Sequence, residues 1–301
     1  MGWLVVGTVP QAHWGFAYGP CQVHGDVVVV DGRSVPVARG TPALVGAATV
    51  AAQTLGIAPP HALLAGDIGS GDGSRAAYAY LLDIMPQLPF PGITFHYLMP
   101  DVAWHNKLLW AAQERSPRPI LVADAGFMYA AKMSGFASQW DLFTPDVGEM
   151  AFLADEVAPH PFYTRGFLLH EEDRVGELIP RAYAGGNAAR FLLVKGRTDL
   201  VVEQGQVLGQ VASPQVPAME PIGGTGDTLT GMVTAFLAAG YPMADACLRA
   251  ALANRWLGAL ARPTPAWGVA QLVSFIPAAV RQVLEHPAAV EPESAAGRSG
   301  A

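Results

Sequence analysis

One glycine-rich segment has residue types at a spacing that could support phosphoryl transfer. Residues 222–231 have the sequence IGGTGDTLTG, in which a glycine run precedes apolar residues at helical spacing. Glycine lets the backbone approach a ligand closely, and the free N–H groups at the start of a helix favour an anion. Asp227, beside such an anion site, could take the proton from a hydroxyl group that attacks a phosphoryl group. The alternative is that Asp227 only caps the helix.

A second segment, residues 141–149 (DLFTPDVGE), places two carboxylates three residues apart. A helix that begins near Pro145 would have Asp146 and Glu149 on one face. Two carboxylates on one face can hold Mg²⁺, usually through water, near the phosphates of a nucleotide. The alternative is a capping box, in which Glu149 reaches back to the start of the helix.

Two more segments have the composition of loops that contact a ligand. Lys195 follows the apolar run at 191–194 and precedes Gly196. This position suits a phosphate contact, but a solvated charge at a strand end has the same pattern. Residues 66–74 (GDIGSGDGS) are rich in glycine and aspartate and follow another apolar run. They indicate a loop that contacts a substrate, with a flexible surface turn as the alternative.

Short apolar runs indicate the strands that would position these residues. The runs at 27–30, 120–123 and 191–194 each contain about four apolar residues and end at a polar residue or glycine. Strands that are buried on both faces have this pattern, which is typical of a parallel sheet. Two Val-rich arms on either side of Gly205, within residues 199–211, predict a β-hairpin or meander.

Helical patterns alternate with these runs. Residues 41–55 precede Gly56, residues 74–85 precede a proline, and residues 227–239 carry an apolar stripe that ends at Gly240. A glycine directly after the last helical residue commonly ends a helix. The alternation of strands and helices predicts a doubly wound α/β sandwich.

The composition limits the class of protein. The chain has 301 residues and a formal net charge of −7 without a cluster of basic residues, so a nucleic-acid partner is not expected. Its two cysteines, Cys21 and Cys247, form no disulfide framework or zinc motif, which is typical of a reducing compartment. No apolar stretch reaches the roughly 18–20 residues that span a membrane, so a cytoplasmic protein is expected. One domain is predicted over residues 1–286, followed by a flexible tail at 287–301.

Taken in order along the chain, these segments resemble the ribokinase-like superfamily, and most closely its branch of ADP- or ATP-dependent NAD(P)H-hydrate dehydratases. The matching segments are the loop at 66–69 (GDIG), the strand end at 123–127 (ADAGF), the segment at 144–149 (TPDVGE), the strand end at 194–198 (VKGRT) and the run at 224–231 (GTGDTLTG). The last of them is the most specific. Asp146 stands where the dehydratases have a histidine, and in this it resembles the metal motif of ribokinase-type kinases.

The resemblance implies a ribokinase-like three-layer α/β/α sandwich with a mostly parallel central sheet. It also implies that Asp227 is the catalytic base, that ADP or ATP binds, and that Asp146 and Glu149 hold Mg²⁺. The residues implied to contact the nucleotide are Lys195, Gly196, Gly223, Gly224, Thr225 and Gly226. The residues implied to contact the substrate are Gly66, Asp67, Gly69 and Asp124.

The reaction that the resemblance implies is a repair reaction. A nucleotide phosphorylates the hydroxyl group of hydrated NADH or NADPH, and phosphate is then eliminated. Such chemistry depends on positioning and on the neutralisation of charge. Two alternatives stay open: a kinase of a small hydroxylated metabolite, such as a sugar or a vitamin alcohol, and a non-catalytic nucleotide-binding regulator on the same fold. A small-molecule substrate and no membrane partner are expected, and relatives of this fold commonly form homo-oligomers.

Overall fold

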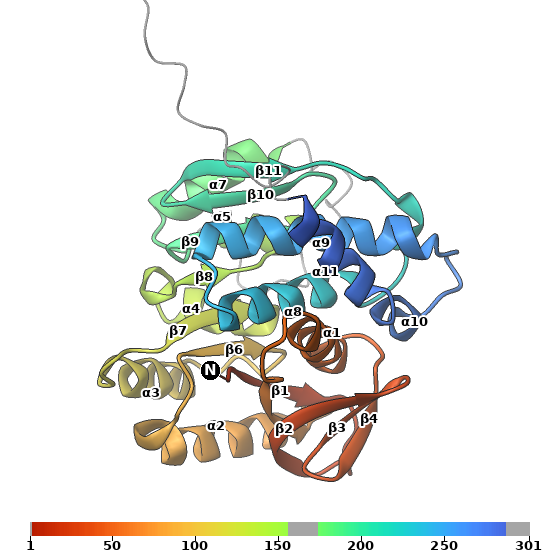
Figure 1. Ribbon diagram of the computed structural model, residues 1–301. Coiled ribbons are helices and arrows are strands. Elements are labelled where there is room, and N and C mark those ends of the chain that lie inside the picture. Colours follow the sequence, from red (N-terminus) through yellow and green to blue (C-terminus); the bar gives the residue numbers. More distant parts are fainter. Residues whose placement is uncertain (1, 156–173, 287–301) are drawn as a thin grey trace, which may run out of the picture.

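An eleven-stranded sheet runs through the described part of the chain, which comprises residues 2–155 and 174–286 of a computed structural model (Figure 1). The strands are β1 (Leu4–Val9), β2 (Phe16–His24), β3 (Val27–Val30), β4 (Arg33–Pro36), β5 (His61–Gly66), β6 (Gly92–His96), β7 (Ile120–Asp124), β8 (Leu142–Phe143), β9 (Phe191–Val194), β10 (Asp199–Glu203) and β11 (Gln206–Val211). The helices are α1 (Thr41–Thr54), α2 (Asp72–Ile84), α3 (Val102–Gln113), α4 (Gly126–Met133), α5 (Val147–Ala154), α7 (Val175–Ala184), α8 (Thr225–Ala238), α9 (Met243–Ala261), α10 (Val269–Val273) and α11 (Ile276–Glu285).

The centre of the sheet is parallel and both of its ends are antiparallel. The strands lie in the order β11-β10-β9-β8-β7-β6-β1-β5-β2-β3-β4. The six strands from β9 to β5 pair in parallel, whereas the strands outside them pair antiparallel. Helices α1 and α8 to α11 pack on one face, and α2 to α5 and α7 on the other (Figure 1). This arrangement confirms the three-layer α/β/α sandwich.

The central strands are buried on both faces of the sheet. In β7, Val122 belongs to the core on the α8 side, whereas Leu121 and Ala123 belong to the core on the opposite side. The side chains of β9 divide between the two cores in the same way. The interpretation of both apolar runs as doubly buried strands is therefore confirmed. The predicted hairpin is also confirmed, because β10 pairs antiparallel with β11.

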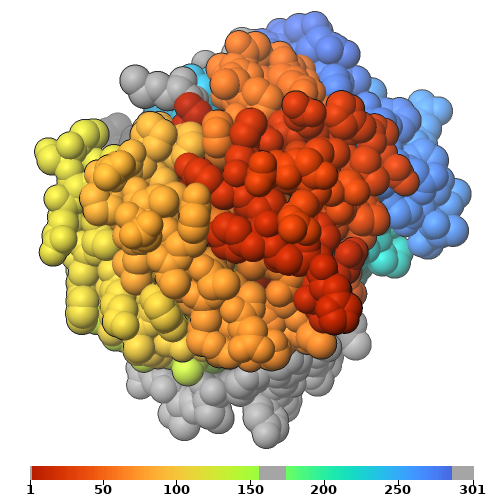
Figure 2. Space-filling view, turned by 90° about the horizontal axis from the view of Figure 1, so that it is seen from below, coloured from red at the N-terminus to blue at the C-terminus, as the bar shows by residue number. Residues whose placement is uncertain are grey.

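The expectation of a parallel sheet was wrong for β3. This strand pairs antiparallel with β2 and β4 at one end of the sheet, and its residues alternate between half-buried and buried. Asp31 and Gly32 have φ angles of 50° and 73° and form the tight turn to β4. A run of valines is compatible with a strand that is buried on one face as well as with one buried on both faces. The Asp-Gly pair after the run indicates the antiparallel pairing more clearly, because it forms a tight turn. The red N-terminal part of the chain forms much of the surface seen from below (Figure 2).

One glycine lets helices α1 and α8 cross closely. A Cβ on Gly231 would overlap the carbonyl oxygen of Leu44 in α1. Only glycine is therefore tolerated at this point of contact. Gly56 and Gly240 follow the two helices with φ angles of 70° and 88°, as the sequence predicts. Helix α8 begins at Thr225, two residues before the predicted start.

No helix within residues 2–155 and 174–286 is long and apolar enough to cross a membrane. The predicted tail at 287–301 lies outside the described residues. The assignment of residues 1–286 to one domain stays a prediction.

Candidate active site

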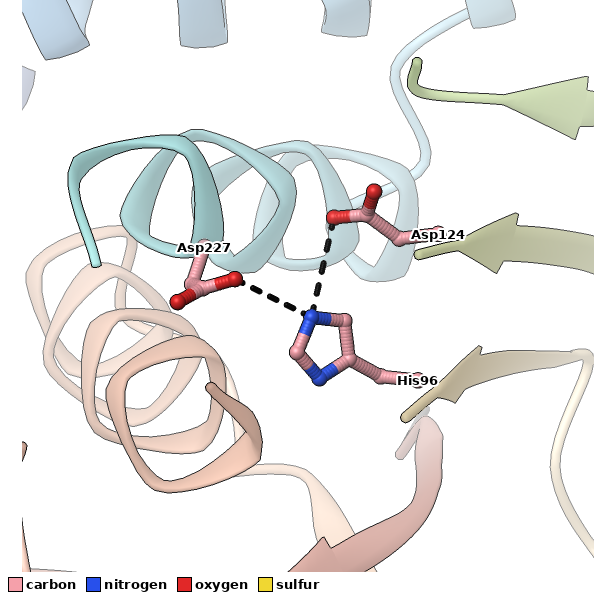
Figure 3. A group of neighbouring side chains, drawn as sticks. All are labelled: His96, Asp124 and Asp227. Atoms are coloured by element: carbon pink, nitrogen blue, oxygen red, sulfur yellow. Dashed lines mark hydrogen bonds and ion pairs between the residues drawn. The ribbon is translucent and has the colours of Figure 1, made fainter. Parts of the chain in front are cut away.

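Three ionisable side chains meet at the carboxyl edge of the parallel strands (Figure 3). His96 is the last residue of β6, Asp124 is the last residue of β7, and Asp227 lies in the first turn of α8. His96 Nε2 is 3.1 Å from Asp227 Oδ1 and 3.8 Å from Asp124 Oδ2. Neighbouring parallel strands end at the same edge of a sheet, which is where ligands of α/β proteins commonly bind.

The carboxylate of Asp227 is held by residues that are distant in the sequence. Its Oδ2 accepts a 2.6 Å hydrogen bond from the N–H of Gly40, directly before α1, and its Oδ1 contacts His96. No described side chain caps the start of α8 at Gly224, so Asp227 does not act as the cap of its own helix. Its side chain is 15% exposed, which leaves part of the carboxylate open to a ligand.

The contacts of Asp227 favour its ionised form. Burial alone would raise the pKa of Asp227, but the hydrogen bond and charge of His96, the charge of Lys195 and the Gly40 N–H lower it below the ordinary value. An ionised carboxylate can only accept hydrogen bonds, so His96 Nε2 carries the proton in this contact. His96 Nδ1 lies 3.0 Å from the hydroxyl oxygen of Thr41. The imidazole therefore has a partner on each nitrogen, and its orientation is determined.

Lys195 and Asp124 form a buried ion pair next to this cluster. Lys195 Nζ is 2.9 Å from Asp124 Oδ1, and Asp124 Oδ2 accepts a 2.6 Å hydrogen bond from the hydroxyl of Thr230 in α8. Burial lowers the pKa of Lys195, but Asp124 and Glu149 raise it by more, so the side chain stays charged. The ammonium group lies beside Gly226 at the start of α8. A positive charge is thus fixed next to the glycine run.

Asp146 and Glu149 form a capping box at the start of α5. Asp146 Oδ1 accepts a hydrogen bond from the N–H of Glu149, and Glu149 Oε2 accepts one from the N–H of Asp146, both at 2.8 Å. Burial and the Asp146 carboxylate raise the pKa of Glu149 well above its ordinary value, against the effect of Lys195. Both residues follow β8, which lies between β7 and β9. The structure therefore brings them to the same edge as Asp124 and Lys195.

The glycine-rich loop at 66–74 is organised by its own aspartate. Asp67 accepts hydrogen bonds of 2.8–3.1 Å from the N–H groups of Gly69, Gly71 and Ser74 and from the Ser74 hydroxyl. Burial raises the pKa of Asp67, but these bonds lower it below the ordinary value. The residue is only 7% exposed. Among the described residues, its bonds do not join it to the Asp227 cluster, and a substrate contact by this loop stays a prediction.

His96, Gly40 and Thr41 lie in the candidate site, although no motif of the sequence indicated them. His96 ends a strand (GITFH) in which an apolar run has a polar end, the same pattern that identified Asp124. That pattern could have identified His96. Gly40 contributes only a backbone N–H group, and its place beside Asp227 depends on how α1 packs against α8.

A cavity of about 240 Å³ opens beside the Lys195 ion pair. Its lining residues are Val147, Val175, Val194, Lys195, Gly196, Arg197, Thr198, Leu200 and Gln215. It combines apolar walls with two of the six residues that were predicted to contact a nucleotide, Lys195 and Gly196. A more open cavity of about 500 Å³, between residues 11–14 and 33–34, contains none of the predicted site residues.

Comparison with known proteins identifies the family. A family model described as NAD(P)H-hydrate dehydratase matches residues 100–274, more than half of the chain. The chain belongs to the NAD(P)H-hydrate dehydratase family. An uncharacterized protein of Methanocaldococcus jannaschii is 37% identical to this family member over 221 residues, which cover 73% of this chain and 90% of that protein.

Solved kinases have the same fold as this NAD(P)H-hydrate dehydratase family member. A mutant of phosphofructokinase-2 from Escherichia coli has a TM-score of 0.51 at 15% identity and covers 93% of this chain and 99% of its own. The tetrameric inhibited form of the same enzyme has a TM-score of 0.51 at 14% identity with the same coverage. Identities this low show the fold alone. The family match makes the chain an enzyme of the dehydratase or small-molecule kinase type.

Proposed function

We propose that this chain dehydrates hydrated NADH or NADPH by transferring a phosphoryl group from ADP or ATP to the hydroxyl group of the hydrate. The observation that carries the proposal is the state of Asp227. Its carboxylate is ionised, partly exposed, and held by His96 and Gly40 beside the glycine run. A carboxylate that is already oriented can accept the hydroxyl proton without a costly rearrangement.

The proposed reaction has two chemical steps. In the first, the hydroxyl oxygen of the hydrate bonds to the terminal phosphorus, the bond from that phosphorus to the rest of the nucleotide breaks, and Asp227 takes the hydroxyl proton. In the second, the carbon–oxygen bond breaks and phosphate leaves with the former hydroxyl oxygen. Loss of a proton from the neighbouring carbon then restores the double bond of NAD(P)H. The products are NAD(P)H, phosphate and a nucleotide shortened by one phosphate.

The residues around Lys195 fit a nucleotide. The cavity beside Lys195 and Gly196 has apolar walls formed by residues such as Val147 and Val175, which suit a planar base. The Lys195 ammonium group stays charged and lies beside Gly226, so it can offset the negative charge of phosphate. We assign the terminal phosphates to the N–H groups of Gly223, Gly224, Thr225 and Gly226.

The donor set at the start of α5 fits Mg²⁺. Asp146 and Glu149 each use one carboxylate oxygen in the capping box. Their second oxygens are hard ligands of the kind that Mg²⁺ prefers, commonly through water. The charge of bound Mg²⁺ would also offset the burial and the Asp146 charge that raise the pKa of Glu149, and would favour its ionised form. Mg²⁺ bound there would neutralise phosphate charge. The capping box holds both carboxylates in place, so it is compatible with this role.

A kinase of a small hydroxylated metabolite is the second candidate function. Asp146, in place of the histidine of the dehydratases, favours it. Both reactions require Asp227 and differ in the molecule that supplies the hydroxyl group. A non-catalytic regulator would not need an ionised carboxylate at this position. We further propose that the protein is cytoplasmic and forms homo-oligomers, the latter because the similar phosphofructokinase-2 structure is tetrameric.

An anaerobic turnover assay tests the proposed function. Chemically prepared NADH hydrate is incubated with the protein, Mg²⁺ and either ADP or ATP, and NADH is followed by its absorbance. We expect recovery of NADH that requires one of the two nucleotides, which identifies the phosphoryl donor. No recovery, with the same hydrate shown active on an established dehydratase, would contradict the proposal. Consumption of nucleotide in a screen of small alcohols would then support the kinase.

A further inference from the structure

Tyr97, directly after His96, has a backbone conformation that is unusual for its size. Its φ angle is 50°, in the left-handed region that bulky residues rarely adopt, and 52% of its surface is exposed. A half-exposed side chain makes few packing contacts that could offset the energy cost of such a conformation. Backbone strain of this kind clusters at sites that bind ligands.

The ring of Tyr97 lies against the residues that hold Asp227. It meets the ring of His96 edge to face, with centroids 4.4 Å apart. A Cβ built on Gly40 would lie 3.6 Å from the Tyr97 ring, and the N–H of Gly40 is the one that binds Asp227. The carbonyl oxygen of Tyr97 accepts a 2.6 Å hydrogen bond from the Thr8 hydroxyl. The ring of Tyr97 therefore lies directly beside both groups that hold the Asp227 carboxylate.

Two neighbouring loops place further apolar side chains at the same edge of the sheet. Ile68, after β5, and Met99, after β6, are both exposed. The hydroxyl of Ser74 connects the loops, because it donates to Asp67 and accepts from the N–H of Met99. A sugar or an open-chain polyol needs polar partners for each of its hydroxyl groups, which these side chains do not offer. Exposed apolar and aromatic side chains suit the largely apolar face of a ring with few hydroxyl groups instead.

We infer that Tyr97 is a substrate-binding residue that forms one wall of the acceptor site and packs its ring against the ring of the acceptor that carries the hydroxyl group. This inference rests on the proposed function, because that function places the acceptor beside Asp227. Under the proposed function, this wall is what favours an acceptor with its hydroxyl on or next to a nitrogen-containing ring over a sugar.

Binding of NADH hydrate to four proteins tests the inference. Calorimetry with Mg²⁺ and a non-hydrolysable nucleotide compares the wild type with Tyr97→Phe, Tyr97→Leu and Trp110→Leu. Trp110 is a matched control, because it is 50% exposed and contacts Phe136 rather than any residue of the site. We expect Tyr97→Leu to weaken hydrate binding roughly tenfold and Tyr97→Phe to retain it within about twofold, because the ring makes the contact. Trp110→Leu should bind as the wild type does.

The affinity for the nucleotide serves as the folding control and should be equal in all four proteins. If Tyr97→Leu binds the hydrate as tightly as the wild type, the inference is overturned while the proposed function stands. If the wild type does not bind the hydrate, the proposed function fails instead. Nucleotide consumption is then measured with a hydroxymethylpyridine and with ribose. A preference for the pyridine that Tyr97→Leu loses supports the inference, and any other result overturns it.

Discussion

Two glycine-rich segments lead into helices, residues 66–74 into α2 and residues 222–227 into α8. Asp67 in the first segment and Asp227 in the second are held by different kinds of partner. Asp67 accepts its hydrogen bonds from its own loop and the start of α2. Asp227 is held by His96 and Gly40, which are 131 and 187 residues away in the sequence.

The difference supports the proposed role of Asp227 as the base and favours a structural role for Asp67. The pKa values of both carboxyl groups lie below the ordinary value, so charge does not distinguish them. What distinguishes them is the origin of their partners. The oxygens of Asp67 are used within one loop, whereas Asp227 stands where β6, α1 and α8 meet and keeps part of its carboxylate exposed. Two similar sequence patterns thus have different structures. The first is a loop held by hydrogen bonds within itself, and the second is a site formed by residues of several elements.

Asp227→Asn should have the largest effect. The amide keeps the size of the side chain but cannot accept the hydroxyl proton, so we expect kcat to fall by roughly 10²–10⁴-fold. Nucleotide affinity should change little, because the glycine run and Lys195 are unaltered. Turnover kinetics and calorimetric nucleotide binding measure the two quantities. Unchanged turnover would remove Asp227 from the role of base.

His96→Asn should have the next largest effect. It removes the hydrogen bond that orients the Asp227 carboxylate, and a hydrogen bond to a charged group contributes about 1.5–3 kcal/mol. We therefore expect kcat to fall by roughly 10–100-fold with little change in KM. A rise in KM at constant kcat would show instead that His96 contacts the substrate.

Asp67→Asn should affect stability more than catalysis. The loop loses acceptors for several buried N–H groups, so the free energy of unfolding should fall by about 1–3 kcal/mol. The kcat per folded molecule should fall far less than in Asp227→Asn, because Asp67 bonds to its own loop and not to Asp227. KM can rise, because the same loop carries Ile68. Asp72→Asn is the matched control in the same loop, because Asp72 is exposed and its side chain contacts the exposed residues Ser70 and Arg75. If Asp67→Asn lost as much turnover as Asp227→Asn, the distinction between the two loops would be wrong.

The smallest expected effect is the pH dependence of the Asp67→Asn stability loss. The pKa of Asp67 is depressed in the folded state. Its contribution is therefore fully present above the unfolded pKa of about 3.9 and is lost as the pH falls through the folded pKa. The difference in unfolding free energy between wild type and variant should stay constant from about pH 8 to pH 5 and shrink in stronger acid. Urea unfolding at several pH values measures it, and a difference that grew with acid would contradict the assigned bonds.

The parts of the fold that depend on local pattern could be predicted from the sequence. Two features of this kind are the apolar runs that form β7 and β9 and the glycines that follow α1 and α8. They determine structure through residues that are adjacent in the sequence. The pairing of β3 could not be predicted from its valines, because it depends on which strand lies beside it. The same limit applies to the site. The motif identified Asp227, but its partners His96 and Gly40 depend on strand order and on the crossing at Gly231.

The fate of the hydroxyl oxygen tests the central claim most directly. NADH hydrate labelled with oxygen-18 in its hydroxyl group is converted with the nucleotide that supports turnover, and the released phosphate is analysed by mass spectrometry. If the hydroxyl is phosphorylated and phosphate then leaves by breakage of the carbon–oxygen bond, each phosphate carries one labelled oxygen. Unlabelled phosphate, with the label found in water, would show that the hydrate loses water directly and would contradict phosphoryl transfer to its hydroxyl group.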